Sequence, residues 1–257
     1  MINIKTNSIN FNNQFQDIIC IDTSDCNLFL KQIYNYEFYT QEPSIEINNQ
    51  NYSINELFII NDLTMVNTLY SFNSKNILMS LINSNNSWEQ SKILNLNTLE
   101  QIKNDINQTI GKELLSINSN LSKMMKVIFE LEEHQFINKD ILIKWLTLNK
   151  NKNKQTIIFN NYSNIKISDL VPFIHSYNFI ILTNDFRMHC SNFDELELVS
   201  FVNKNNIVTI QSKDSIINWM ENYFKEKIND SDFEKYFKID DVDSKIMTFL
   251  LKKEIFS

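Results

Sequence analysis

The N-terminal sixty residues carry short apolar runs of the kind that form strands. Such runs cover Phe15–Ile21, Ser44–Tyr52 and Glu56–Asn61, and Asn48–Gln50 in the middle of the second run predicts a hairpin turn. We expect the three runs to lie in one sheet. At the third run, the stretch Leu57–Asp62 is continuously apolar and ends in a carboxylate, which is the pattern of a strand buried on both faces.

The same continuous apolar pattern recurs twice in the second half of the chain, at Thr156–Asn161 and Phe179–Asp185. Between these runs, Ser168 can cap a short helix that tolerates Pro172 near its start. A strand, a helix and a strand in this order predict a right-handed β-α-β unit with parallel strands. A further strand is expected over Asn205–Gln211.

From Asn73 to Trp145 the apolar positions follow a helical period. Ser74 can cap a first helix, and Lys139–Leu148 forms a last one. Between them, apolar residues at steps of three or four predict a single helix of about 45 Å, which Asn118–Asn120 could break in two. This stripe consists of Leu99, Ile102, Ile106, Ile110, Leu114, Ile117, Leu121, Met124 and Ile128.

Two amphipathic helices are expected near the C-terminus, over Asp214–Lys227 and Asp243–Phe256, packed on the sheet or on a neighbouring subunit. The fold class is therefore α/β, with a mainly parallel sheet interrupted by a helical insertion. We expect an α/β head over residues 1–72, a helical leg over 73–154, and the rest of the head with a C-terminal extension over 155–257. The apolar sides of the last two helices carry Trp219, Met220, Tyr223, Phe224, Phe249 and Leu250.

Glycine is almost absent from the chain, since Gly111 is the only one among 257 residues. Phosphate-binding loops need backbone without Cβ so that successive amides can approach the phosphate closely. The Walker loop and the dinucleotide fingerprint are therefore excluded, and we expect no bound nucleotide and no enzymatic activity of the ATPase, GTPase or Rossmann type.

Cysteine and histidine show no pattern of a disulfide framework, a zinc site or a catalytic pair. No leader segment and no apolar run of the ~20 residues that span a bilayer are recognised, so we expect a cytoplasmic protein that is not integral to a membrane. The residues concerned are Cys20, Cys26, Cys190, His134, His175 and His189.

The formal net charge of −7 argues against nucleic-acid binding over the whole surface, but it leaves room for a local basic patch. Arg187 is the only arginine, so recognition of base edges by guanidinium groups is nearly impossible and any DNA binding would be to the backbone. On the expected long helix, Lys112, Lys123 and Lys126 fall on one side, opposite the apolar stripe, with about 21 Å between the first and the last. The alternative is a solvated helix face.

A second lysine group, formed by Lys150, Lys152 and Lys154, is either a further phosphate contact or a polar loop. Two carboxylates, Asp62 and Asp185, end predicted buried strands, where open α/β sheets place ligands and catalytic groups. Their alternative role is to cap the following helix or turn.

The order of these elements and four short motifs resemble the Csn-two family of type II-A CRISPR accessory adaptation proteins. The motifs are the helix KQIYNYE at 31–37, the strand FIINDL at 58–63, QTIIFNN at 155–161 and IILTNDFR at 180–187. The resemblance covers about residues 1–211, and the remainder looks like the extension of a longer variant.

This resemblance implies a degenerate P-loop-ATPase-like head without nucleotide, and a homotetrameric ring that holds the ends of double-stranded DNA during spacer acquisition. It also implies partners among the CRISPR adaptation integrase and the type II effector nuclease. Family members bind calcium through an acidic segment between leg helices. The matching stretch here, Glu113–Ser122, holds one carboxylate, so Glu130, Glu132 and Glu133 are the candidate substitutes.

Two alternatives stay open. One is a divergent nucleotide hydrolase or nuclease that uses Asp62 and Asp185. The other is a protein-only adaptation scaffold whose C-terminal helices bind partners.

Overall fold

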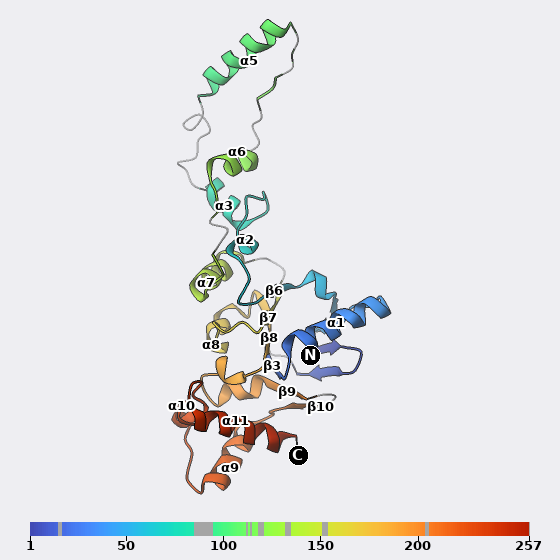
Figure 1. The fold of residues 1–257 in the computed structure, drawn as a ribbon, viewed down its shortest axis with the longest axis vertical. Coiled ribbons are helices and arrows are strands. Elements are labelled where there is room, and N and C mark those ends of the chain that lie inside the picture. The colour runs from blue at the N-terminus through green and yellow to red at the C-terminus, as the bar shows by residue number, and fades with distance from the viewer. Residues whose placement is uncertain are drawn as a thin grey trace. The chain divides into compact units, whose positions relative to one another are not determined.

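The computed structural model describes residues 1–257 except 15–16, 85–94, 112, 114, 118–120, 132–134, 151–153, 204–205 and 257. The chain forms two compact units (Figure 1). The first unit consists of Met1–Thr64 and Asn138–Ser257, and the second consists of Met65–Ile137. The second unit is therefore shorter than the leg expected at 73–154.

A six-stranded sheet forms the centre of the first unit, with the strand order β10-β9-β3-β8-β7-β6. Five neighbouring strands run parallel and only β10 runs antiparallel, which confirms the α/β class with a mainly parallel sheet. The strands are β3 (Ile18–Thr23), β6 (Phe58–Ile60), β7 (Gln155–Asn160), β8 (Tyr177–Thr183), β9 (Val199–Asn203) and β10 (Asn206–Thr209).

The predicted β-α-β unit is present, because β7 and β8 pair in parallel with Ile158 opposite Ile180. Every residue of β8 is buried, as its continuous apolar run predicts. The connection contains a short helix, α8 (Ile167–Leu170), followed by a 3-10 turn, η2 (Val171–Phe173). Ser168 lies inside α8 and does not cap it, since the capping position belongs to Lys166.

A second sheet of four antiparallel strands, with the order β2-β1-β4-β5, also belongs to the first unit. The expectation of one N-terminal sheet was wrong: the hairpin pairs with β1, while β3 and β6 join the parallel sheet. The turn itself is confirmed, with Asn48 and Asn49 in the left-handed region at φ 50° and 66°. The strands are β1 (Ile2–Lys5), β2 (Asn10–Asn13), β4 (Ile45–Ile47) and β5 (Gln50–Tyr52).

One apolar core joins the two sheets through helix α1 (Cys26–Thr40). Phe29 and Ile33 of α1 are buried in the same cluster as Ile4 of the small sheet and Ile180 of the large one. Burial of this many branched side chains is the main stabilising contribution to the first unit. A 3-10 turn, η1 (Ile54–Glu56), then leads into β6.

Helix α7 (Lys139–Leu148) forms where expected, but it belongs to the first unit and not to the leg. The physical reason is Trp145, which is 7% exposed and stacks on Phe58 of β6 with 5.4 Å between ring centroids. The hydroxyl of Tyr177 donates a hydrogen bond to the carbonyl of Asn149 at 2.6 Å, which fixes the end of α7 to β8. Helical period alone does not say which core a helix packs on.

The C-terminal extension packs on the rest of the first unit through aromatic rings. Phe237 contacts Phe186 and Phe193, with ring centroids 5.5 Å and 6.1 Å apart. The predicted C-terminal helices are confirmed, with bounds shifted by one to three residues. The elements of the extension are α9 (Lys213–Phe224), η5 (Asp230–Asp232), α10 (Phe233–Phe237) and α11 (Val242–Ile255), and the 3-10 turns η3 (Phe186–Met188) and η4 (Asp194–Leu198) precede it in the head.

The second unit is helical, but the single long helix expected there was wrong. Helix α5 (Leu96–Ile110) ends at Gly111, whose φ of 73° terminates the helix in the left-handed region. The side chain of Asn107 then holds the returning chain by hydrogen bonds to both the N–H and the carbonyl of Leu115. The other helices described are α2 (Val66–Leu69), α3 (Ile77–Ser84) and α6 (Leu121–Ile128).

The packing of α7 can be tested by replacing Trp145 with alanine. We expect the free energy of unfolding to fall by about 3 kcal/mol or more, because the change removes a buried ring and leaves a cavity against β6. Denaturant unfolding of the variant and the wild type measures this difference in the free energy of unfolding. The matched control is Phe249→Ala, whose ring is 67% exposed and whose loss should change stability by less than about 0.5 kcal/mol. Equal effects of the two changes would contradict the placement of α7.

Candidate functional site

The connection between β3 and α1 stands where a P-loop head would place its phosphate loop. Only Ser24 and Asp25 separate the two elements, and the Asp25 carboxylate accepts a hydrogen bond from the N–H of Leu28 at 2.9 Å. This carboxylate satisfies the helix N-terminus and places negative charge where a phosphate would bind. The connection is therefore too short for a phosphate cradle and has the wrong charge.

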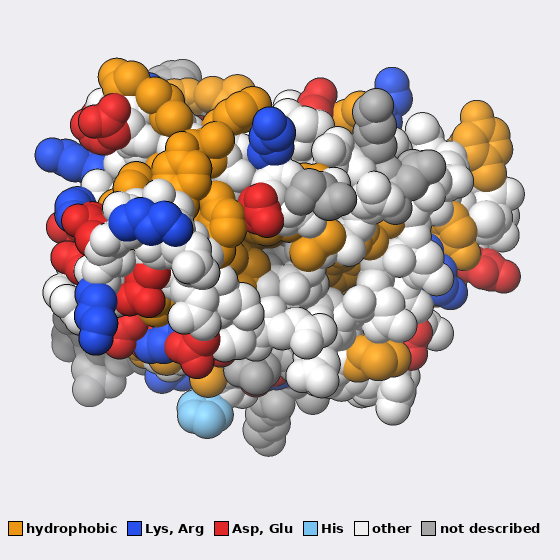
Figure 2. Space-filling view, turned by 90° about the horizontal axis from the view of Figure 1, so that it is seen from below, with side chains coloured by type: hydrophobic (Ala, Val, Ile, Leu, Met, Phe, Trp, Pro, Cys, Tyr) orange, Lys and Arg blue, Asp and Glu red, His pale blue; other side chains and the backbone are white. Residues whose placement is uncertain are grey.

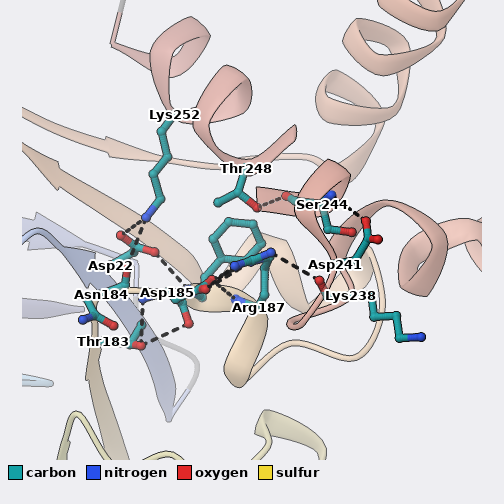
Figure 3. Close-up of polar contacts among 11 residues, drawn as sticks. Asp22, Thr183, Asn184, Asp185, Arg187, Lys238, Asp241, Ser244, Thr248 and Lys252 are labelled. Atoms are coloured by element: carbon teal, nitrogen blue, oxygen red, sulfur yellow. Dashed lines mark hydrogen bonds and ion pairs between the residues drawn. The ribbon is translucent and has the colours of Figure 1, made fainter. Parts of the chain in front are cut away.

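A buried carboxylate, Asp22, lies at the carboxyl end of β3 (Figure 3). It is 4% exposed and accepts hydrogen bonds from the ammonium group of Lys252 at 2.6 Å and from the N–H of Phe186 at 2.9 Å. Burial raises the pKa of Asp22, and the charge and hydrogen bond of Lys252 oppose this rise only in part. Lys252, from helix α11, thus neutralises the end of the central strand.

Sequence reasoning did not single out either partner of this ion pair. Asp22 follows a buried apolar run, which is the signal that drew attention to Asp62 and Asp185, and it could have been found in the same way. Lys252 carries no such signal, because it lies 230 residues further along the chain, in the extension.

Asp185, one of the two candidate catalytic carboxylates, is paired with the only arginine of the chain (Figure 3). Arg187 is 4% exposed, and its guanidinium group donates to both carboxylate oxygens, with Nε to Oδ1 at 2.8 Å. Burial alone would raise the pKa of Asp185, but the hydrogen bonds and charge of Arg187 outweigh it and lower that pKa. Asp185 also caps η3, so it has the capping role that the sequence left open.

The second candidate carboxylate, Asp62, accepts hydrogen bonds from the N–H and the hydroxyl of Ser163 at 3.0 Å and 3.1 Å. These contacts fix the turn after β7 to the turn after β6. Asp62, like Asp185, therefore has a structural partner. Both carboxylates bind loop residues at the carboxyl ends of the parallel strands.

Of the three lysines predicted to form a line along one helix, the structure describes two. Lys123 and Lys126 are exposed on α6, whereas Lys112 lies outside the described residues and beyond the helix end at Gly111. The continuous helix on which the alignment was based ends at Gly111, and the contact of these lysines with DNA stays a prediction.

In the second lysine group, Lys150 is exposed after α7, and Lys152 lies outside the described residues. Lys154 forms an ion pair with Asp17 at 2.5 Å. This pairing makes Lys154 less suitable for a phosphate than a solvated lysine, because a carboxylate already accompanies its charge.

The candidate calcium ligands do not form a site in the described part of the chain. Glu113 and Glu130 are exposed, while Glu132 and Glu133 lie outside the described residues. No group of three or more acidic, histidine or cysteine side chains in the described residues is arranged to hold a metal ion. Calcium needs six to eight oxygen ligands, which these two glutamates alone do not supply.

The cysteines and one histidine are buried in the first unit. Cys20 and Cys190 are buried, and burial raises the pKa of both thiols, so neither is an activated nucleophile. His189 is buried with Nδ1 2.8 Å from the carbonyl of Ile165, and burial lowers its pKa.

Among the described residues, no helix is long and apolar enough to cross a membrane.

Comparisons with known proteins give one informative fold likeness. No family model matches the chain, and no curated protein matches it. Among solved structures, the crystal structure of Stu0660 of Streptococcus thermophilus is similar, with a TM-score of 0.58 at 13% sequence identity. The likeness covers 100% of this chain and 94% of that chain. At this identity it shows a shared fold and not a shared activity.

The Asp22–Lys252 ion pair can be tested by replacing Lys252 with methionine. We expect the free energy of unfolding at pH 7 to fall by about 2 to 3 kcal/mol, because the buried carboxylate loses its cation. The folded pKa of Asp22 lies above its ordinary value of 3.8, so ionised Asp22 costs stability as the pH rises through the folded pKa. The loss should therefore be smaller at about pH 4, where a larger share of folded Asp22 holds a proton than at pH 7.

Urea unfolding at both pH values measures this difference. The matched control is Lys253→Met, which removes the neighbouring exposed charge and should have little effect. A loss from Lys252→Met that is equal at pH 4 and pH 7 would show that the ion pair is not its cause.

Proposed function

We propose that this protein is a non-catalytic member of a CRISPR adaptation system, which binds double-stranded DNA without sequence preference as a ring-shaped homotetramer. The observation that carries the proposal is the fold: an α/β head interrupted in sequence by a helical unit and completed by a C-terminal extension. Four sequence motifs resemble the Csn-two family, and that resemblance predicts a head interrupted by a helical unit. The crystal structure of Stu0660 of Streptococcus thermophilus shares the fold along the whole chain, which supports the arrangement but not the activity.

The distribution of charge supports a local DNA contact on the second unit. Residues 65–137 contain six lysines and seven carboxylates, while the rest of the chain has 18 cationic residues and 24 carboxylates. DNA phosphates are therefore repelled least by the second unit, where Lys123 and Lys126 are exposed. A ring multiplies a few lysines per subunit into an array, so that an acidic protein can still hold a duplex.

An uncovered apolar face on α5 supports assembly. Ile102, Ile106 and Ile110 lie on one face of this helix and are 48%, 38% and 50% exposed. No residue of α5 is buried by the described part of the chain. Such a stripe is typical of a helix that packs against another copy.

The surroundings of the carboxyl strand ends support a role without catalysis. Asp22 is bound by Lys252, and Asp185 is bound by Arg187. Neither arrangement leaves the paired acidic ligands that metal-assisted hydrolysis needs. We place the protein beside the adaptation integrase and the type II effector nuclease as a holder of DNA ends.

A ring that threads DNA requires a free end. We expect linear duplex to bind with an affinity that falls steeply with salt, by a log-log slope of about −0.9 for each phosphate neutralised. Covalently closed circles of the same sequence should compete poorly in a gel-shift assay at fixed salt. Equal competition by circles would rule out threading.

The lysine contacts can be tested with the double variant Lys123→Glu and Lys126→Glu. We expect affinity for linear duplex to fall at least about tenfold for all sequences alike, with a shallower salt dependence, because phosphate contacts and no base contacts are lost. The matched control is Lys227→Glu with Lys245→Glu, which changes the charge equally on the exposed C-terminal extension. If both variants lose affinity equally, net charge and not α6 determines binding.

A further inference from the structure

Helix α11 is apolar on two opposite faces. Met247 and Leu251 are buried, at 3% and 1% exposure, against the first unit. On the other side, Val242, Ile246 and Phe249 follow one another at helical spacing and are 68%, 53% and 67% exposed. A helix on a protein surface normally turns its apolar stripe toward a core or a partner, so a second apolar stripe is a candidate contact surface. The outer face of α11 is therefore built for a contact that the described chain does not supply.

Aromatic side chains extend this face into a groove beside α9 and α10. Tyr223 and Phe224, at the end of α9, are 54% and 38% exposed, with ring centroids 5.1 Å apart. Phe224 lies 5.0 Å from the ring of Tyr236 in α10. Together with Ile246 and Leu250 of α11, these rings line a groove of about 580 Å³. Figure 2 views the molecule from the side of these helices, and hydrophobic side chains gather across the face it shows.

The groove has an acidic border. Its lining includes four carboxylates, those of Glu226, Glu234, Asp241 and Asp243. The segment 226–243 as a whole contains seven carboxylates and three lysines. One of those lysines, Lys235, is paired with Glu226 at 2.9 Å. The surplus of negative charge repels DNA phosphates and anionic lipid surfaces and attracts cationic partners.

We propose that this groove binds an amphipathic helix of a partner protein, whose apolar face is bordered by lysine or arginine. Val242 and Phe249 are about 10 Å apart along the helix, so the outer face of α11 offers apolar contact along about two turns of a partner helix. Exposed tyrosine and phenylalanine rings supply the anchoring contacts that dominate such interfaces. The proposal does not depend on DNA binding, because it concerns a different and acidic surface.

The experiment uses the full chain and a fluorescent 18-residue designed peptide, with leucines at helical spacing bordered by lysines. We expect a dissociation constant in the micromolar range by fluorescence anisotropy, which is typical of a single helix in a groove. Two control peptides, one with glutamate in place of lysine and one with the same composition in scrambled order, should bind at least tenfold more weakly. The scrambled peptide measures simple attraction to a protein with a net charge of −7.

The matched variants are Ile246→Lys in the groove and Phe38→Lys on α1, where Phe38 is 72% exposed. Ile246→Lys should weaken binding of the lysine peptide at least tenfold with an unchanged circular dichroism spectrum, and Phe38→Lys should leave binding unchanged. Equal binding of the scrambled peptide, an equal effect of both variants, or no binding to the wild type would overturn the proposal. If the wild type does not bind the peptide and Ile246→Lys lowers the mass of the oligomer in light scattering, a second copy covers the groove and the proposal is wrong.

Discussion

The scarcity of glycine constrains the whole molecule, because the chain must make its turns with residues that carry a Cβ. Left-handed positions cost least for glycine and next for asparagine, and the hairpin at Asn48 and Asn49 follows this preference. The strand-to-helix connection after β3 is shortened to Ser24 and Asp25 and capped by a carboxylate. A parallel sheet built under this constraint keeps its strand pairing but has no run of backbone without Cβ to bind a phosphate.

The Asp22–Lys252 ion pair neutralises a buried carboxylate at the end of the central strand with a side chain of the C-terminal extension. Parallel sheets gather polar groups at the carboxyl ends of their strands, and a carboxylate buried there needs a cation. Here the cation is Lys252 of α11, so the C-terminal extension supplies the positive charge that the buried carboxylate of the central strand needs. The same extension presents an apolar outer face and an acidic groove. One helix thus links the stability of the head to a surface suited for a partner.

Much of the fold could be predicted from the sequence, because continuous apolar runs specify buried parallel strands and asparagine pairs specify a hairpin turn. What could not be predicted depends on contacts between distant residues. The period of apolar residues across Gly111 is helical, but it does not encode the chain reversal that Asn107 and Leu115 stabilise. The expected lysine line was derived from a continuous helix, so its geometry cannot be read from the apolar period once the helix ends at Gly111. Likewise, only the contacts of Trp145 assign α7 to the first unit.

The acidic head of this chain joins β3 to α1 through two residues, and the helical unit offers exposed lysines and an apolar stripe that the described residues leave uncovered. In the proposed function, DNA binding therefore depends on the assembly of several copies of this chain. The most direct test is the mass of the protein–DNA complex in solution, measured by native mass spectrometry with a linear duplex. The account predicts four chains of 30.5 kDa for each bound duplex, whatever its sequence. A complex that contains a single chain, or a protein that stays monomeric and does not bind, would contradict it.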